Sequence, residues 1–259
     1  MGPMEESELV PVEKYEGEDL SFMTRTAYAR LRELSREIDF VPTTTRIYEQ
    51  YERIHGLTGD IRIRYAIVSN GGRVLVDGRT DAQWDGMIRE AVRSGAASGA
   101  EAKALFDRLA DAGWVLKERY CDELFYAVVV NREEIPDGWM EELAGELARM
   151  GWNCSLQGRK VYLVPDPVSK GAAVRYVKEL AGASFVFAAG DSLLDESMLR
   201  VADEAMAPGH GELFRNYAGK DERGIRFAGR SGILASEDIL EAAANCRKEA
   251  GHTDDEHLF

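Results

Sequence analysis

The sequence predicts an α/β protein: a doubly wound, Rossmann-like core with an α+β unit inserted into it. Two short apolar runs, residues 65–68 and 185–189, have the length and composition of buried strands, and each ends in a polar turn. The sequence pattern changes between residues 81 and 166. Helical and strand-like stretches alternate there, and all four tryptophans fall in this part. Such a pattern is typical of a separate unit inserted between two parts of an α/β domain.

Composition argues against several classes of function. With a net charge of −14 over 259 residues, the protein is not expected to bind nucleic acid without sequence preference, or to bind anionic membranes. No apolar run approaches the roughly 18 residues of a membrane span. Cys121, Cys154 and Cys246 are too widely spaced for a disulfide framework or a zinc motif. We therefore expect a cytoplasmic protein, as a monomer or homodimer, in a reducing compartment.

The first part of the core is expected over residues 1–80. Residues 1–20 are polar and acidic and contain no convincing strand, whereas residues 21–38 carry apolar residues at helical spacing. Residues 40–46 are interpreted as a brief strand that ends in hydroxyls and a cation. Thr44, Thr45 and Arg46 are candidates to bind a phosphoryl group at its carboxyl end. The alternative is that Thr45 only caps the helix that follows.

A second polar strand end follows residues 65–68. Asn70 and Gly71 lie between this run and a further strand-like run, residues 73–76, and an Asn-Gly pair between two strands predicts a hairpin turn. The turn role of Asn70 is compatible with a contact to substrate.

Residues 81–166 are expected to form the inserted unit, with residues 167–259 completing the core. Helices are predicted at 84–92, 101–112 and 138–150, and strands at 115–119, 124–131 and 160–164. The tryptophans flank these elements, so core packing is favoured over stacking on a sugar.

The third polar cluster carries most of the predicted chemistry. Lys170 is the first residue of a predicted helix, where the helix dipole disfavours a cation. A lysine at this position therefore indicates an anionic neighbour; the alternative is a solvated lysine. One helix later, the strand at 185–189 is followed by Asp191, Ser192 and Asp195. Ligands of open α/β sheets bind beyond the carboxyl ends of strands, and Mg²⁺ is held there by carboxylates and phosphate oxygens. We therefore interpret Asp191 as a metal ligand and Asp195 as its partner, which either binds the ion directly or supports Asp191. The alternative is that Asp191 or Ser192 caps the next helix.

These motifs resemble those of the haloacid-dehalogenase-like (HAD) hydrolase superfamily in order and spacing. They are TTR at 44–46, NG at 70–71, KG at 170–171 and GDSLLD at 190–195. The chain looks similar to the Cof-like and sucrose-phosphate-phosphatase-like branch, in which a large cap is inserted between the second and third motifs. On the stretches PVEKYEG, SFMT and VPTTTR, it looks closest to a bacterial group linked to tellurium-resistance and stress gene clusters.

The resemblance implies a role for each motif. Thr44 would hold a phosphoryl oxygen, Lys170 would offset charge on nucleophile and phosphate, and Asp191 and Asp195 would bind Mg²⁺. Arg46, Asn70, Thr45 and Ser192 are expected as further substrate contacts. Leu194 departs from the family, which often has Asn before the final Asp.

The larger departure concerns the first motif of the family. Its members open with a central strand ending in Asp-x-Asp-x-Thr, which supplies the nucleophile and the general acid and base, and no such segment occurs in this sequence. We expect a truncated form in which Met1 lies just downstream of that motif. The first core strand is then absent, and its two neighbours are left with unpaired edges.

The resemblance implies an Mg²⁺-dependent phosphatase that acts on a small phosphorylated metabolite, such as a phosphosugar, in its full-length form. The alternative is a non-catalytic protein that binds Mg²⁺ and a phosphorylated ligand, because the nucleophile motif is missing. A phosphomutase shares the same site chemistry. A nucleotide-binding oxidoreductase is a weaker interpretation, because no G-x-G-x-x-G follows a strand.

Overall fold

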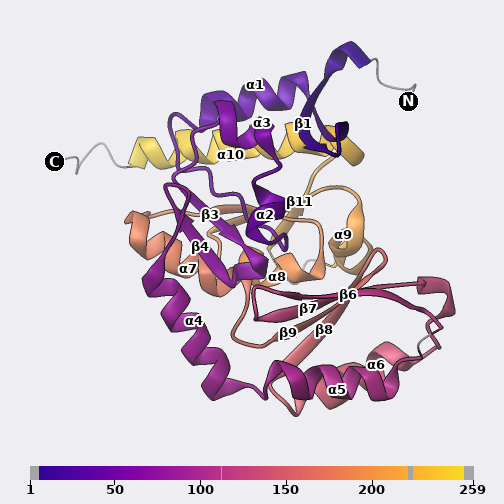
Figure 1. Ribbon diagram of the computed structural model, residues 1–259. Helices are drawn as coiled ribbons and strands as arrows, with labels where there is room; N and C mark the ends of the chain where they lie inside the picture. The colour runs from indigo at the N-terminus through magenta and orange to yellow at the C-terminus, as the bar shows by residue number, and fades with distance from the viewer. Residues whose placement is uncertain (1–5, 112, 221–223, 254–259) are drawn as a thin grey trace.

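The computed structural model describes residues 6–111, 113–220 and 224–253. Helices α1 (Arg25–Leu34) and α10 (Ala235–Thr253) lie side by side at one end of the molecule, and the strands of the core lie in the middle (Figure 1). The inserted unit lies at the opposite end. Within the described residues, no helix is both long and apolar enough to cross a membrane.

The first two strands of the described chain form a β-hairpin, so the expectation that residues 1–20 contain no strand was wrong. Strands β1 (Leu9–Tyr15) and β2 (Glu18–Thr24) pair antiparallel, and Gly17 closes the turn between them at φ 92°. The hairpin buries only a few side chains, among them Val12 and Glu13. With little to bury, its sequence lacks the apolar alternation that marks most strands.

The predicted strand at 40–46 is reduced to a single parallel bridge between Thr43 and Ile67 of strand β3 (Tyr65–Val68). The N–H of Ile67 donates to the carbonyl of Pro42 at 2.8 Å, and the N–H of Thr44 donates to that of Ile67 at 2.9 Å. Pro42 has no N–H of its own, so it cannot extend the ladder.

The helix after this segment does not use Thr45 as its cap. Helix α2 (Tyr48–Tyr51) begins after Ile47, whose side chain makes no capping hydrogen bond, and the short helix α3 (His55–Asp60) follows. The capping alternative for Thr45 was therefore wrong.

The hairpin predicted from the Asn-Gly pair is confirmed. Strand β3 pairs antiparallel with β4 (Arg73–Val76), which pairs in turn with β5 (Arg79–Thr80). The turn Ser69–Gly71 has positive φ at all three residues, 55°, 58° and 94°. Such values suit Asn and Gly far better than other residues, which explains the sequence signal.

The second part of the core is an all-parallel sheet. Its strand order is β10 (Phe187–Ala189), β11 (Glu204–Ala207), β12 (Ile225–Phe227). The helices of this part are α7 (Lys170–Ala181), α8 (Glu196–Leu199), α9 (Gly211–Tyr217) and α10. Among the described residues β10 pairs only with β11, and the bridge at Thr43 reaches only β3. The expected core sheet is therefore present in two separate parts.

The inserted unit is an antiparallel sheet covered by helices, as predicted, with strand order β6-β7-β9-β8. The strands are β6 (Val115–Cys121), β7 (Phe125–Val130), β8 (Trp152–Gln157) and β9 (Lys160–Pro165), and the helices packed with them are α5 (Gly99–Leu109) and α6 (Trp139–Ala148). Strand β8 was not predicted. Trp114, Trp139 and Trp152 pack in the core between sheet and helices, as expected.

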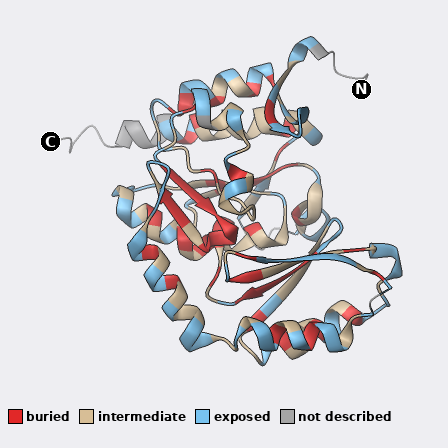
Figure 2. Cartoon of the chain, in the orientation of Figure 1, coloured by how far each residue is buried: buried red, intermediate tan, exposed pale blue. Residues whose placement is uncertain are grey.

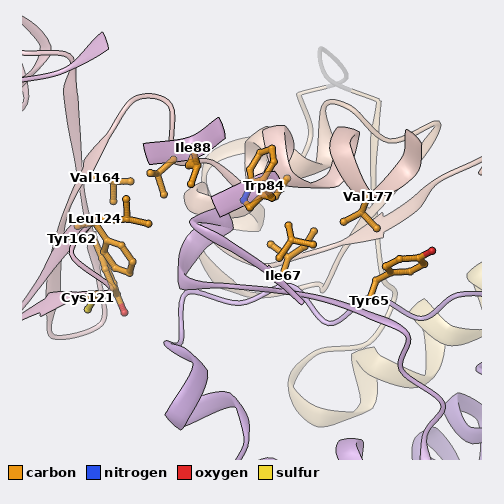
Figure 3. Packing of buried hydrophobic residues seen from close by; sticks show 13 residues of the cluster. Tyr65, Ile67, Trp84, Ile88, Cys121, Leu124, Tyr162, Val164 and Val177 are labelled. Atoms are coloured by element: carbon orange, nitrogen blue, oxygen red, sulfur yellow. The ribbon is translucent and has the colours of Figure 1, made fainter. Parts of the chain in front are cut away.

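The other face of the inserted sheet packs against the core. Cys121, Leu124, Tyr162 and Val164 belong to the same buried cluster as Ile67 of the core (Figure 3). Helix α4 (Ala82–Gly95) connects the two parts and contributes Trp84 and Ile88 to that cluster. Figure 2 shows buried residues concentrated in β3, β4 and the inserted sheet, with exposed residues on the outer sides of the helices.

A partly buried ion pair attaches the N-terminal hairpin to the core. The carboxylate of Glu13 is 0% exposed and accepts two hydrogen bonds from the guanidinium of Arg46, one of them at 3.0 Å, and one at 2.6 Å from the hydroxyl of Ser21. The hydrogen bonds from Arg46 hold the pKa of Glu13 below its usual value, because they outweigh the opposing effect of burial.

We predict that Glu13→Gln lowers the free energy of unfolding at pH 7 by about 1–3 kcal/mol, since it removes a charge-assisted pair. The folded-state pKa of Glu13 lies below its unfolded value, so the stabilisation is complete above about pH 4.3 and is lost as the pH falls through the folded-state pKa. Urea denaturation of both proteins at pH 7 and near pH 3 should show the gap between them narrowing on acidification. Glu33→Gln, at an exposed helical position, is the control. A gap that stays constant with pH would contradict this account.

Candidate functional site

One cavity of about 450 Å³ lies between the core and the inserted unit. Six of the eight predicted site residues line it: Thr44, Thr45, Lys170, Asp191, Ser192 and Asp195. Arg46 and Asn70 are not among its lining residues. Three stretches that are distant in sequence therefore meet at one place in the fold, as the strand-end argument predicts.

Thr44 is held by its backbone on both sides. Its N–H donates to Ile67 at 2.9 Å, and its carbonyl accepts from the N–H of Asn70 at 3.0 Å. Its hydroxyl oxygen accepts from the N–H of Arg46 at 3.1 Å. The hydroxyl proton therefore stays available to an acceptor in the cavity.

Lys170 has the anionic neighbour that its position indicated. It is the first residue of α7, behind the N-cap Ser169, and only 5% of it is exposed. Its ammonium donates to Oδ1 of Asp195, which is equally buried. The alternative of a solvated lysine is therefore excluded.

Asp195 organises the loop that carries Asp191. Its Oδ2 accepts from the N–H groups of Asp191 and Ser192, both at 3.0 Å, and from the hydroxyl of Ser192 at 2.9 Å. Burial raises the pKa of Asp195, but the charge of Lys170 and these hydrogen bonds outweigh it, so the pKa lies below the ordinary value. Ser192 forms a reciprocal capping box with Asp195, so the capping alternative applies to Ser192 as well.

Asp191 presents its carboxylate to the cavity. It is exposed there, and no hydrogen bond or ion pair holds this carboxylate within the part of the chain that the structure describes. Its carbonyl accepts from the N–H groups of Glu212 and Leu213 at the start of α9, at 3.0 and 3.1 Å. The backbone of Asp191 is thus fixed while its side chain is left free.

This donor set fits Mg²⁺ with one protein carboxylate. Mg²⁺ is usually held by one or two carboxylates together with phosphate oxygens and waters, and Asp191 can serve as such a ligand. The described residues contain no group of three His, Cys, Asp or Glu side chains that would hold a metal by themselves. Both oxygens of Asp195 already accept hydrogen bonds, which favours the indirect of the two roles expected for it, support of the Asp191 loop, over direct contact with the metal ion.

The two predicted substrate contacts outside the cavity have other partners. The guanidinium of Arg46 is bound by Glu13 of β1. Asn70 is buried, its N–H donates to Thr44, and its Oδ1 has no hydrogen-bond partner. A Cβ on the following Gly71 would lie 2.3 Å from the carbonyl oxygen of Ser169. The Asn-Gly turn therefore packs between Thr44 and the start of α7 and sets the distance between these two parts of the site.

Sequence reasoning did not find the charged and amide side chains on the remaining sides of the cavity. They are Arg132 and Gln157 of the inserted unit and Glu212 and Arg215 of α9. None belongs to a recognisable local motif. Oε2 of Glu212 accepts from the N–H of Leu193 at 2.9 Å, which ties α9 to the loop of Asp191.

We predict that Gly190→Ala disrupts the site. A Cβ at this position would lie 2.4 Å from Cβ and 2.8 Å from Oδ2 of Asp195, so the carboxylate would have to move away from its donors. We expect a loss of about 1–3 kcal/mol in the free energy of unfolding, the usual range for an overpacked core, measured by urea denaturation. Gly145→Ala in α6 is the matched control, because a Cβ there meets nothing within 4 Å. Equal stability of Gly190→Ala and the wild type would refute the close packing described here.

Comparison with known proteins supports the fold. No family model and no curated protein matches the chain. Among solved structures, a sucrose-phosphatase from a Synechocystis species, in complex with sucrose and phosphate, is 17% identical with a TM-score of 0.69, over 85% of this chain and 90% of that one. A HAD subclass IIB sugar phosphatase is 12% identical with a TM-score of 0.56, over 87% and 92% of the two chains. The chain therefore has the fold of the HAD-superfamily phosphatases with a cap, as the sequence motifs predicted.

Proposed function

We propose that the protein is an Mg²⁺-dependent phosphomonoester hydrolase in its full-length form, acting on a small phosphorylated metabolite. The observation that carries this proposal is the meeting of a hydroxyl, an ammonium and a free carboxylate, from Thr44, Lys170 and Asp191, at one cavity. Those are the groups that bind a phosphoryl dianion and its metal ion. Two structures of similar fold are described as a sucrose-phosphatase and a sugar phosphatase, which supports a phosphosugar as substrate.

Each residue has a defined task in this proposal. Thr44 and Thr45 hydrogen-bond phosphoryl oxygens, and the ammonium of Lys170 offsets negative charge beside them. Asp191 binds Mg²⁺, which, when bound, stabilises the charge of the transferring group. Asp195 holds Lys170 and the Asp191 loop in place. The inserted unit, residues 81–166, covers the site and excludes bulk water.

Hydrolysis through an aspartyl-phosphate needs one more carboxylate as the nucleophile. The carboxylates that line the described cavity are Asp191, Asp195 and Glu212. The first is the proposed metal ligand, and the other two bind backbone or lysine donors. In this proposal the nucleophile is a carboxylate other than these three.

A second candidate function rests on the same observation. With these three carboxylates otherwise engaged, the chain as given is suited to bind Mg²⁺ and a phosphorylated ligand without turnover. Assaying the chain for release of phosphate from p-nitrophenyl phosphate separates the two functions. Hydrolysis above background would exclude a purely binding role, whereas binding of phosphate without hydrolysis would support it.

We predict that Asp191→Asn abolishes Mg²⁺-dependent binding of inorganic phosphate, because it removes the charge of the proposed metal ligand. Isothermal titration calorimetry with and without Mg²⁺ measures this directly, and it needs no nucleophile. Asp137→Asn, at an exposed position of the inserted unit, should bind like the wild type. Unchanged Mg²⁺-dependent binding by Asp191→Asn would show that the metal assignment is wrong.

A further inference from the structure

The wall that the inserted unit contributes to the cavity differs in chemical character from the side formed by Thr44, Lys170 and Asp191. It consists of Arg132, at the turn after β7, and of Leu156, Gln157 and Gly158 at the turn between β8 and β9. In the described structure, no acidic and no aromatic side chain of the inserted unit lines the cavity. This wall therefore offers hydrogen-bond donors and positive charge.

The donors on this wall are largely unused. The side-chain nitrogen of Gln157 is buried and has no hydrogen-bond partner. Nη1 of Arg132 reaches only the carbonyl of Gly158, at 3.5 Å, and no carboxylate among the described residues pairs with Arg132. Leaving the buried nitrogen of Gln157 without an acceptor costs about 1–3 kcal/mol, so a ligand that brings an acceptor to it would be favoured. Arg132, in contrast, is exposed, so its guanidinium is open to a ligand without such a penalty.

The cations that line the cavity differ in whether a carboxylate neutralises them. Lys170 is neutralised by Asp195. Arg132 of the inserted unit and Arg215 of α9 make no ion pair within the described residues. Arg215 does not pair even with Glu212, although both line the cavity from the same helix. The planar fork of an arginine matches carboxylate and phosphate groups.

We propose that the substrate carries a second anionic group, a carboxylate or a further phosphate, on its leaving-group side, and that Arg132 and Gln157 bind it. This inference rests on the proposed function, since it assigns the phosphoryl group to Thr44, Lys170 and Asp191. Among the residues that the structure describes, no aromatic side chain lines the cavity for stacking on a base, and the cavity volume of about 450 Å³ suits a small molecule. The substrate class is thus a short phosphorylated polyol or sugar acid rather than a nucleotide.

Three matched ligands test the inference by calorimetry in Mg²⁺. Glycerol 3-phosphate ends in a hydroxymethyl group, where 3-phosphoglycerate has a carboxylate and glycerol 1,3-bisphosphate has a second phosphate. 3-Phosphoglycerate and glycerol 1,3-bisphosphate each carry a second anionic group. The wild type should bind at least one of them about tenfold more tightly than glycerol 3-phosphate, the factor expected for one charge-assisted hydrogen bond. The tighter of the two identifies which anionic group the wall takes.

Substitution of the wall should remove this preference alone. Arg132→Gln should bring the three affinities within about twofold, while binding of inorganic phosphate stays unchanged. Arg159→Gln is the matched control, because Arg159 lies in the neighbouring turn between β8 and β9, is exposed and does not line the cavity.

The failures of the two proposals can be told apart. If the wild type binds inorganic phosphate but binds all three ligands equally, the second anionic group is refuted and the phosphoryl site stands. If Arg132→Gln keeps the preference, the assignment of that group to Arg132 is refuted, and the phosphoryl site again stands. If the wild type does not bind inorganic phosphate in Mg²⁺, the proposed function is refuted, and this inference with it.

Discussion

The site depends on the buried ion pair between Lys170 and Asp195. Each residue is only 5% exposed, and burying either charge alone would cost several kcal/mol. The pair lets a lysine open a helix, where the dipole disfavours it, and keeps Asp195 ionised away from water. Because Asp195 also accepts from the N–H groups of Asp191 and Ser192, one carboxylate sets the positions of both the ammonium and the proposed metal ligand.

The surrounding fold fits this arrangement closely. Gly190 leaves room for the Asp195 carboxylate, and Gly171 brings α7 against the carbonyl of Ser197. The strained turn at Asn70 and Gly71 separates Thr44 from the start of α7. The inserted unit then closes the cavity from the other side, anchored by a buried cluster that it shares with the core. In the proposed function, the core therefore supplies the phosphoryl-binding groups, and the inserted unit supplies the groups that meet the rest of the ligand.

The sequence predicts those parts of the molecule whose signals are local. Strand β3, its Asn-Gly turn and the loop after β10 are recognisable because apolar runs end in polar residues at each of them. The N-terminal hairpin is not, since it buries too little to show alternation. The Glu13–Arg46 pair joins positions 33 residues apart, and the tip of the β8–β9 turn faces the cavity only through tertiary packing. No spacing rule exposes contacts of this kind, which is why Arg46 was expected among the residues around the cavity, where it does not lie, and Gln157, which lines the cavity, was not expected there.

A double-mutant cycle on Lys170→Met and Asp195→Asn, read as free energies of unfolding in urea, tests the central ion pair most directly. Each single variant leaves one buried group without its partner, so each should lose about 3–5 kcal/mol. The double variant removes both charges. Its loss in free energy of unfolding should be smaller than the sum of the two single losses, by a coupling energy of at least about 1 kcal/mol. Losses that add to within about 0.5 kcal/mol would contradict the account, because the two residues would then act independently.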